Sequence, residues 1–244
     1  MDPLSEVLQS VRLTGAVFLE ARFTAPWCVS ARVGPEDCRP HLAQPVQVIA
    51  YHYVVEGGMV VSLDGGGPVE VRRGQTVLLP RNDPHVLGSA PGLPPVDADR
   101  LIQPAPRGSV ARIVHGGGGA RTRIVCGFLG SDQARHPLVA ALPRLLTVDM
   151  AQAGSGEWIE SSLRFALRRL AEGRLGAPTV MSRLSELMLV EAVRCYAATL
   201  PADRTGWLAG LRDRHIGRAL ALIHGRPQHP WTTASLPREV GLSR

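Results

Sequence analysis

Two histidines and a cysteine are the residues of this sequence best suited to chemistry. His52 follows an apolar run, His85 ends the stretch that begins at Gly74, and Cys126 lies in a later apolar run. Imidazole and thiol groups can bind a polar ligand, hold a soft metal ion, or satisfy one another by hydrogen bonds. We predict a ligand pocket containing His52, His85, Cys126 and Tyr51. A metal site of His52, His85 and Cys126 and a purely internal hydrogen-bond set remain alternatives.

Signatures of catalysis are otherwise absent from the sequence. It contains no GxSxG elbow, HExxH helix, P-loop or dinucleotide fingerprint. Three acidic residues, Glu56, Asp64 and Glu70, fall at turns or alternate positions, where we expect them to be solvated. The prediction is therefore a protein that is not an enzyme and carries no cofactor.

Strands must position these residues, because the first 130 residues are rich in short β-branched runs between Gly and Pro turns. This spacing predicts an antiparallel sandwich or barrel. By the strand period of two, His52 shares a face with Ala50. Residues 88–108 are predicted to form a long loop, and the four glycines at 116–119 a flexible hairpin tip. The predicted strands are 16–23, 46–55, 59–64, 69–71, 76–80, 111–115 and 122–129.

Helices follow after about residue 154, where the apolar period becomes 3.6. One face of the first helix carries Ile159, Leu163, Ala166 and Leu170. A second helix over 179–200 is apolar nearly all round at 187–190. Such a segment is typical of burial between other elements or of a subunit contact.

The last forty residues predict a helix–turn–helix. Asp213 and Thr232 are suitable N-caps for its two helices, and Gly225 and Gly241 suit the turns. Pro237 would kink or shift the second helix. Serine also stands at 235, where a glutamate would complete a capping box. The expected apolar stripe of the first helix is Ile216, Ala219, Leu220 and Ile223.

Composition fits a soluble globular chain. The net charge is +6 and all 27 basic residues are arginine, which we attribute to codon usage rather than to phosphate contacts. The four cysteines form no CxxC pair, as expected of reduced thiols. No apolar run reaches the ~20 residues that span a membrane, and the N-terminus lacks a secretion signal. We expect a cytoplasmic protein with no membrane partner.

The segments YHYVVEG and LLPRNDPH resemble the motifs of the cupin fold. Gly74, Pro80 and His85 match its second motif, and Asn82 stands where glycine is usual. Asparagine tolerates positive φ, so the turn can survive. In the first motif the usual glutamate falls on Ala50 and no His-x-His precedes it. Most of the cupin metal set is therefore missing.

The C-terminal segment resembles the start of an AraC/XylS-type DNA-binding domain through IGRALALIH, the following W-T and VGLSR. The segments DPLSEVL, IVCGF, HPLVAALP and GWLAGLRD extend the resemblance over the whole chain. It implies a β-rich cupin-like barrel (a double-stranded β-helix), a helical linker and a partial all-α helix–turn–helix, α+β overall. The implied domains are an effector-binding domain at 1–150, a dimerisation linker at 155–202 and part of the DNA-binding domain at 206–244.

A ligand-responsive transcription regulator is the function that this resemblance implies. Its partners would be a small-molecule effector, a second copy in a homodimer and, in the full-length form, DNA. The chain stops within the first helix–turn–helix, so we expect no sequence-specific DNA affinity from it alone. Alternatives are a stand-alone cupin binding protein, a dominant-negative dimerisation partner, and a metal-dependent cupin enzyme. The DNA-contacting residues would be Thr232, Thr233, Ser243 and Arg244.

Overall fold

The computed structural model describes most of the chain, and its contacts divide into two compact units. The larger unit comprises 13–134 and 142–192, and the smaller comprises 1–12, 135–141 and 193–244. The described residues are 4–5, 7, 13–39, 42, 45–103, 110–131, 136–150, 156–172, 174, 176–201, 206–211 and 213–242. None of the described helices is long and apolar enough to span a membrane.

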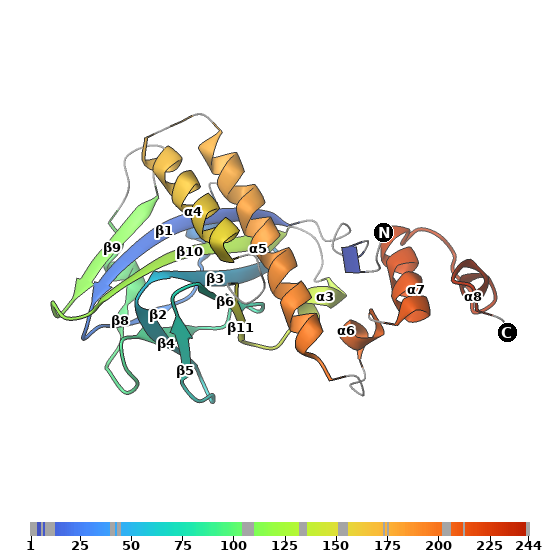
Figure 1. The fold of residues 1–244 in the computed structure, drawn as a ribbon, viewed down its shortest axis with the longest axis horizontal. Helices are drawn as coiled ribbons and strands as arrows, with labels where there is room; N and C mark the ends of the chain where they lie inside the picture. The colour runs from blue at the N-terminus through green and yellow to red at the C-terminus, as the bar shows by residue number, and fades with distance from the viewer. Residues whose placement is uncertain are drawn as a thin grey trace. The chain divides into compact units, whose positions relative to one another are not determined.

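Two sheets form the larger unit (Figure 1). The six-stranded sheet has the order β11-β6-β3-β10-β1-β9, and the five-stranded sheet the order β5-β4-β7-β2-β8. The strands of the first are β1 Thr14–Thr24, β3 Gln47–Glu56, β6 Gln75–Leu79, β9 Ala111–Gly116, β10 Arg121–Ser131 and β11 Leu146–Asp149. Those of the second are β2 Cys28–Ala31, β4 Gly58–Leu63, β5 Val69–Arg72, β7 His85–Gly88 and β8 Val96–Asp97.

One hydrophobic core fills the space between the sheets, and it is drawn from alternate residues of the strands. Along β1 the inward positions include Leu19, Ala21 and Phe23, all buried, while Arg22 between them is exposed. This alternation is what the strand period dictates when one face is covered. The predicted β-rich barrel followed by helices is confirmed, and all seven predicted strands are present.

The strand pairing differs from the antiparallel pattern that we expected. The pairs β1–β9 and β2–β8 are parallel. The segment 88–108 is also not simply a loop, since it contains β8, a 3-10 helix η1 at Ala98–Arg100 and a bridge from Gln103 to Arg112. Positions 104–109 lie outside the described residues. Strands of two to four residues carry few side chains to show a period, and of these only β5 is among the predicted strands; β2, β7, β8 and β11 are not.

The four-glycine run is not a flexible hairpin tip, and that prediction is wrong. β9 and β10 do not pair with each other, because β1 lies between them. The run crosses the end of β1, where Gly117 and Gly119 donate backbone hydrogen bonds to the carbonyls of Thr24 and Ala25, both at 2.8 Å. At Gly116, where φ is +134°, any Cβ would collide with the Thr24 carbonyl. Glycine is required here by close backbone approach.

Two helices, α4 at Gly156–Ala171 and α5 at Ala177–Thr199, lie across the six-stranded sheet (Figure 1). On α4 the predicted inner face is confirmed at Ile159, Leu163 and Ala166, which are at most 2% exposed; the Leu170 side chain lies outside the description. On α5 the apolar segment is only half buried, since Leu187 is 47% exposed. Burial within the monomer therefore does not account for it. A short helix, α2 at Pro35–Cys38, borders the other sheet.

The smaller unit contains α3 Pro137–Ala140, α6 Trp207–Gly210, α7 Arg214–Gly225 and α8 Ser235–Glu239. The cap of α7 is confirmed, because the Asp213 carboxylate accepts from the amides of His215 and Ile216. The predicted apolar stripe of α7 does not coincide with its buried face. Ile216 is 49% and Ile223 37% exposed, while the buried residues are Gly217, Ala221 and Leu222.

The helix α8 is shifted, as Pro237 predicts. It begins at Ser235, so Pro237 is its third residue, in the first turn where a missing amide costs no helical bond. The prediction of Thr232 as the N-cap is wrong, because the N-cap of α8 is Ala234 and makes no side-chain cap hydrogen bond. Thr232 and Ser235 bond each other instead. Ser235 N donates to Thr232 Oγ1 at 2.9 Å, and Thr232 N donates to Ser235 Oγ at 3.0 Å, a reciprocal pair like a capping box. Ser243 and Arg244 lie outside the described residues.

Candidate functional site: a cavity inside the barrel

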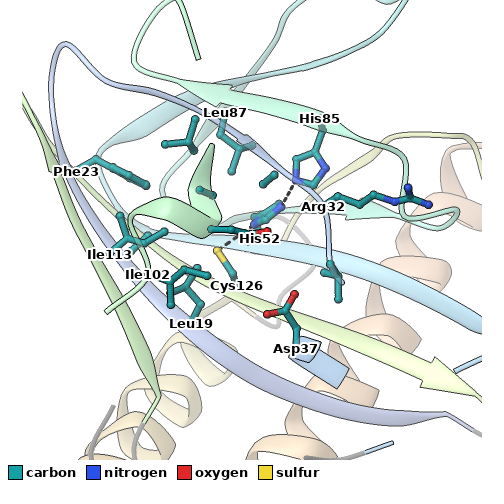
Figure 2. Close-up of a pocket in the computed structure, with 16 residues that line it drawn as sticks. Leu19, Phe23, Arg32, Asp37, His52, His85, Leu87, Ile102, Ile113 and Cys126 are labelled. Carbon is teal, nitrogen blue, oxygen red and sulfur yellow. Dashed lines mark hydrogen bonds between the residues drawn. The ribbon is translucent and has the colours of Figure 1, made fainter. Parts of the chain in front are cut away.

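Three of the predicted site residues meet inside the barrel (Figure 2). His52 is brought by β3, His85 by β7 and Cys126 by β10, where it lies directly opposite His52 in the strand register. His52 Nδ1 lies 3.1 Å from Cys126 Sγ, and His52 Nε2 lies 2.7 Å from His85 Nε2. All three side chains are buried.

One backbone carbonyl sets the direction of every hydrogen bond in this group. His85 Nδ1 lies 2.9 Å from the Asp83 carbonyl oxygen, which can only accept, so Nδ1 carries the proton. In the neutral ring His85 Nε2 is then an acceptor, and His52 Nε2 must donate to it. His52 Nδ1 is left as an acceptor for the Cys126 thiol. The result is a chain of donors running from Cys126 through both rings to the Asp83 carbonyl.

Burial keeps the three hydrogen-bonded side chains, His52, His85 and Cys126, in their neutral forms. Desolvation lowers the pKa of His52 well below its usual range, and the nearby His85 lowers it further. Burial also lowers the pKa of His85, against the opposing effect of its bond to the Asp83 carbonyl. The Cys126 pKa is raised by burial to about 12, so the thiol stays protonated. A protonated thiol is a poor nucleophile and a poor metal ligand.

The cavity beside these residues is small and largely apolar. Its volume is about 40 Å³, close to the ~30 Å³ that one water occupies in the liquid. Phe23 forms part of the wall and is stacked on Trp27 with 4.0 Å between ring centroids. The other apolar lining residues are Leu19, Ala21, Val29, Ala31, Val33, Leu87, Ala98, Ile102 and Ile113.

Charged residues stand at the exposed side of the cavity. Arg32, Asp37 and Asp99 line it there, and none of them is fully buried. The Asp37 pKa is raised, chiefly by partial burial, although the carboxylate accepts from the Gly34 amide at 2.8 Å. A wider groove of about 500 Å³ continues outward from Arg32, Asp99 and His85. Sequence reasoning missed these three residues, because isolated charged residues in loops and single helical turns show no periodic signal.

The turn before His85 explains how the chain delivers that histidine. Asn82 has φ +51°, as its place in the cupin motif predicts. Its side chain accepts from Val33 N at 3.1 Å and donates to Val33 O at 2.8 Å. Asparagine therefore does more than replace glycine: it ties the turn to a residue of the cavity wall.

Tyr51, also predicted as a ligand-binding residue, does not line this cavity. It precedes His52 on β3 and so points to the opposite face of the sheet. Its hydroxyl lies 2.6 Å from Ser185 Oγ on α5, and either hydroxyl can be the donor in this contact. Carbonyl acceptors lie within reach of both, at Ala16 for Tyr51 and at Met181 for Ser185.

The alternative metal site is not assembled. Among the residues that the structure describes, no three His, Cys, Asp or Glu side chains surround one position. His52 lies between its two partners and directs a different nitrogen at each, so the three donors do not converge. Ala50, at the glutamate position of the cupin motif, is a buried core residue without a donor atom.

Comparison with known families identifies the fold. The family model described as Cupin (Cupin_6) matches residues 2–198. The chain belongs to the cupin family. Within it, the resemblance to AraC-type regulators is confirmed by curated relatives. An AraC-like transcription regulator of Streptomyces antibioticus is 26% identical over 245 residues, covering 100% of this cupin chain and 76% of the relative. The regulator AlkR of Acinetobacter baylyi is 25% identical over 248 residues, with coverages of 100% and 76%.

This cupin also aligns with a solved structure. ToxT from Vibrio cholerae matches with a TM-score of 0.38 and 9% identity, covering 97% of this chain and 71% of ToxT. The two curated relatives, and RclR of Escherichia coli, are named as transcription regulators or activators. The predicted function, a transcription regulator of the AraC type with a cupin sensor domain, is confirmed at the level of the family.

Proposed function

We propose that the barrel cavity is the effector site of this regulator, and that its effector enters with an apolar group. The observation that carries the proposal is the directed chain of hydrogen bonds along one wall. Both rings and the thiol already satisfy one another, so a polar effector group would have to break a buried bond, at a cost of about 1–3 kcal/mol. An apolar group meets Phe23 and its neighbours at no such cost.

The polar end of the effector would remain at the rim. Arg32, Asp37 and Asp99 offer one cation and two carboxylates there, beside the outer groove. A volume of about 40 Å³ holds little more than a water. Binding of a larger group must therefore widen the barrel, and this widening is the change that a regulator can transmit.

The test of the effector site uses linear alkanols of two to eight carbons as probes, with thermal unfolding as the readout. We expect a saturable rise in Tm that depends on chain length, because a ligand that binds only the folded state stabilises it. Ala21→Val, which fills the cavity, should abolish the rise. Ala16→Val is the matched control, since Ala16 is a buried alanine of the same strand that does not line the cavity. An equal response in both variants would exclude the cavity as the site.

We further propose that the chain forms a homodimer through the outer face of α4 and α5. Large apolar side chains stand exposed there, and a groove of about 590 Å³ runs between them. Such a patch is typical of an association surface. The same two helices pack with their other face on the six-stranded sheet, so dimerisation through the patch would be coupled to the barrel that holds the cavity. The patch consists of Trp158, Phe165, Val180, Leu187 and Val190.

Sedimentation velocity tests this dimer. Leu187→Glu places a charge in the patch and should convert the dimer to a monomer without unfolding it, because Leu187 is 47% exposed. Val114→Glu is the control, since Val114 is 62% exposed on β9, outside the patch. A wild-type monomer at tens of micromolar protein, or equal dissociation in the control, would contradict the proposal.

The remaining parts of the proposal follow from the family. The protein acts in the cytoplasm, without a catalytic role or a resident cofactor, and contacts DNA in the full-length form. Thr232 and Thr233 precede α8 and remain the predicted DNA-contacting residues within the described part of the chain. A promoter-reporter assay with their alanine variants, at matched protein level, tests that role.

A further inference from the structure

A basic pocket lies on the surface where β1, β9 and β10 end together, and the proposed effector site makes no use of it. Its volume is about 500 Å³. The charged and polar side chains that line it include those of Arg22, Thr24, Glu56, His115, Arg121 and Arg123. Three arginines gathered in one pocket repel each other unless something compensates their charge.

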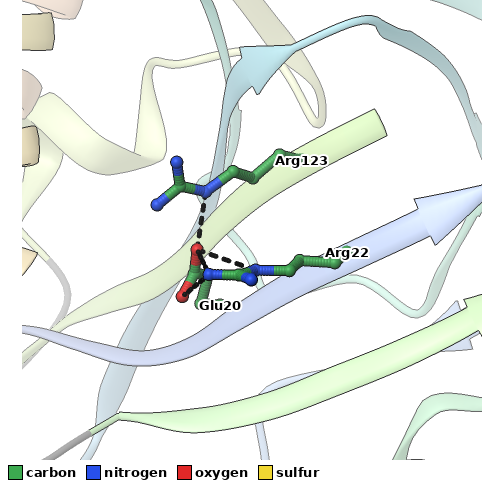
Figure 3. Close-up of polar contacts among 3 residues, drawn as sticks. All are labelled: Glu20, Arg22 and Arg123. Atoms are coloured by element: carbon green, nitrogen blue, oxygen red, sulfur yellow. Dashed lines mark hydrogen bonds and ion pairs between the residues drawn. The ribbon is translucent and has the colours of Figure 1, made fainter. Parts of the chain in front are cut away.

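Glu20 supplies part of that compensation (Figure 3). Arg22 on β1 and Arg123 on β10 lie directly opposite each other, a placement that is unfavourable for like charges. The Glu20 carboxylate, only 6% exposed, accepts from Arg123 Nε at 2.6 Å and from Arg22 Nη2 at 3.2 Å. One buried anion thus fixes the positions of two guanidinium groups.

Both guanidinium groups keep donors that Glu20 does not use. Arg123 reaches the carboxylate through Nε alone, and Arg22 through Nε and Nη2. Their side chains remain 32% and 54% exposed. Arg121 adds a third cation, and within the described residues its guanidinium makes no hydrogen bond. Against Glu20 and Glu56 the pocket retains an excess of positive charge.

We propose that this pocket binds the phosphate group of a small molecule. A guanidinium offers paired N–H donors that match phosphate oxygens, and a phosphate carries the negative charge that the pocket lacks. Because Glu20 already holds two of the arginines in place, little side-chain entropy is lost on binding. Thr24 completes the rim: its hydroxyl accepts from Gly118 N and retains its own proton for donation.

Isothermal titration calorimetry tests the proposal, with inorganic phosphate and glycerol phosphate as probes and potassium chloride holding the ionic strength constant. We expect one saturable site for at least one of the probes, and the tighter probe distinguishes a free ion from an ester. Arg121→Ala should weaken binding about tenfold, the usual effect of losing a bond to a charged group. Arg72→Ala is the control, because Arg72 is an exposed strand arginine of the same unit that does not line the pocket.

Three results would overturn the phosphate site. They are the absence of saturable heat for both probes, equal losses in the Arg121 and Arg72 variants, and Arg121-dependent binding of a DNA duplex when neither small phosphate binds. Circular dichroism establishes that both variants remain folded. A failure here leaves the effector cavity untouched, since the two pockets share only Phe23.

Discussion

A proton placed by one backbone carbonyl governs the chemistry of the cavity. Because the Asp83 carbonyl only accepts, it fixes the tautomer of His85, then that of His52, and finally the direction of the Cys126 thiol. Sequence spacing could bring these residues together, since β3 and β10 are long and the cupin motif delivers His85. It could not choose between a metal site and a hydrogen-bond chain. That choice depends on the orientation of the two imidazole rings and on differences of less than an ångström in the distances between their nitrogens and the neighbouring groups.

Stability should fall as the pH drops below about 6.5, the usual pKa of histidine. Burial lowers the pKa of His52 and His85 in the folded state, so below pH 6.5 the unfolded chain binds more protons than the folded one. The stabilising effect is complete above pH 6.5 and is lost at up to about 1.4 kcal/mol per pH unit per histidine.

Urea denaturation at pH 7.5 and 5.5 measures this loss. His52→Met should reduce the pH dependence, while the rest of the protein, including His136 with its pKa lowered to about 4 by burial and by His224, continues to contribute. An unchanged dependence in the variant would show that the buried pair does not titrate as described.

Asn82 allows a second test at the level of one residue. Asn82→Gly keeps the positive φ but removes both bonds to Val33, which should cost about 1–3 kcal/mol. Asn82→Ala loses the same bonds and adds the strain of a left-handed residue, about 1 kcal/mol more. Equilibrium unfolding should rank wild type above Gly and Gly above Ala. If alanine were the milder substitution, the turn geometry would be wrong.

Strand β3 is the element that joins the cavity to the helices. His52 faces the cavity, and Tyr51, one residue earlier, reaches Ser185 on α5. Gly127 on β10 lies against the Tyr51 ring, so closely that a Cβ there would collide with the phenol. Any widening of the barrel at His52 therefore moves Tyr51 and the helix that it holds. The sequence indicated each element but not this connection, because pairing between distant segments leaves no local pattern.

A double-mutant cycle measures the contact between β3 and α5. Tyr51→Phe and Ser185→Ala should each destabilise the protein by about 1–2 kcal/mol, and the double variant by less than their sum, because both remove one buried bond. Thr199→Ala is a control, since the Thr199 hydroxyl only bonds a carbonyl within α5. Strict additivity would mean that the two hydroxyls are not coupled.

At the scale of the whole molecule, the sequence was most informative where a pattern is local or where a family resemblance exists. The barrel, its cupin motif and the cap of α7 were within reach of such reasoning, whereas the N-cap predicted for α8 was wrong. Such reasoning did not reach the parallel strand pairs, the exposed side of α7 or the passage of the four-glycine run across the end of β1. They depend on which distant segment arrives beside each element, and that is decided by the packing of the complete chain.

The position of β1 has a consequence for synthesis of the protein. Of the strands in the described residues it is made first, yet its two neighbours, β9 and β10, span 111–131 and are made about a hundred residues later. Until then its 11 residues have no partner in the sheet, and an unpaired strand of this kind invites misassociation. Arrest-peptide force measurements on nascent chains should register folding only after β10 has cleared the exit tunnel. The order of translation thus leaves β1 without a partner in its sheet until β10 has emerged.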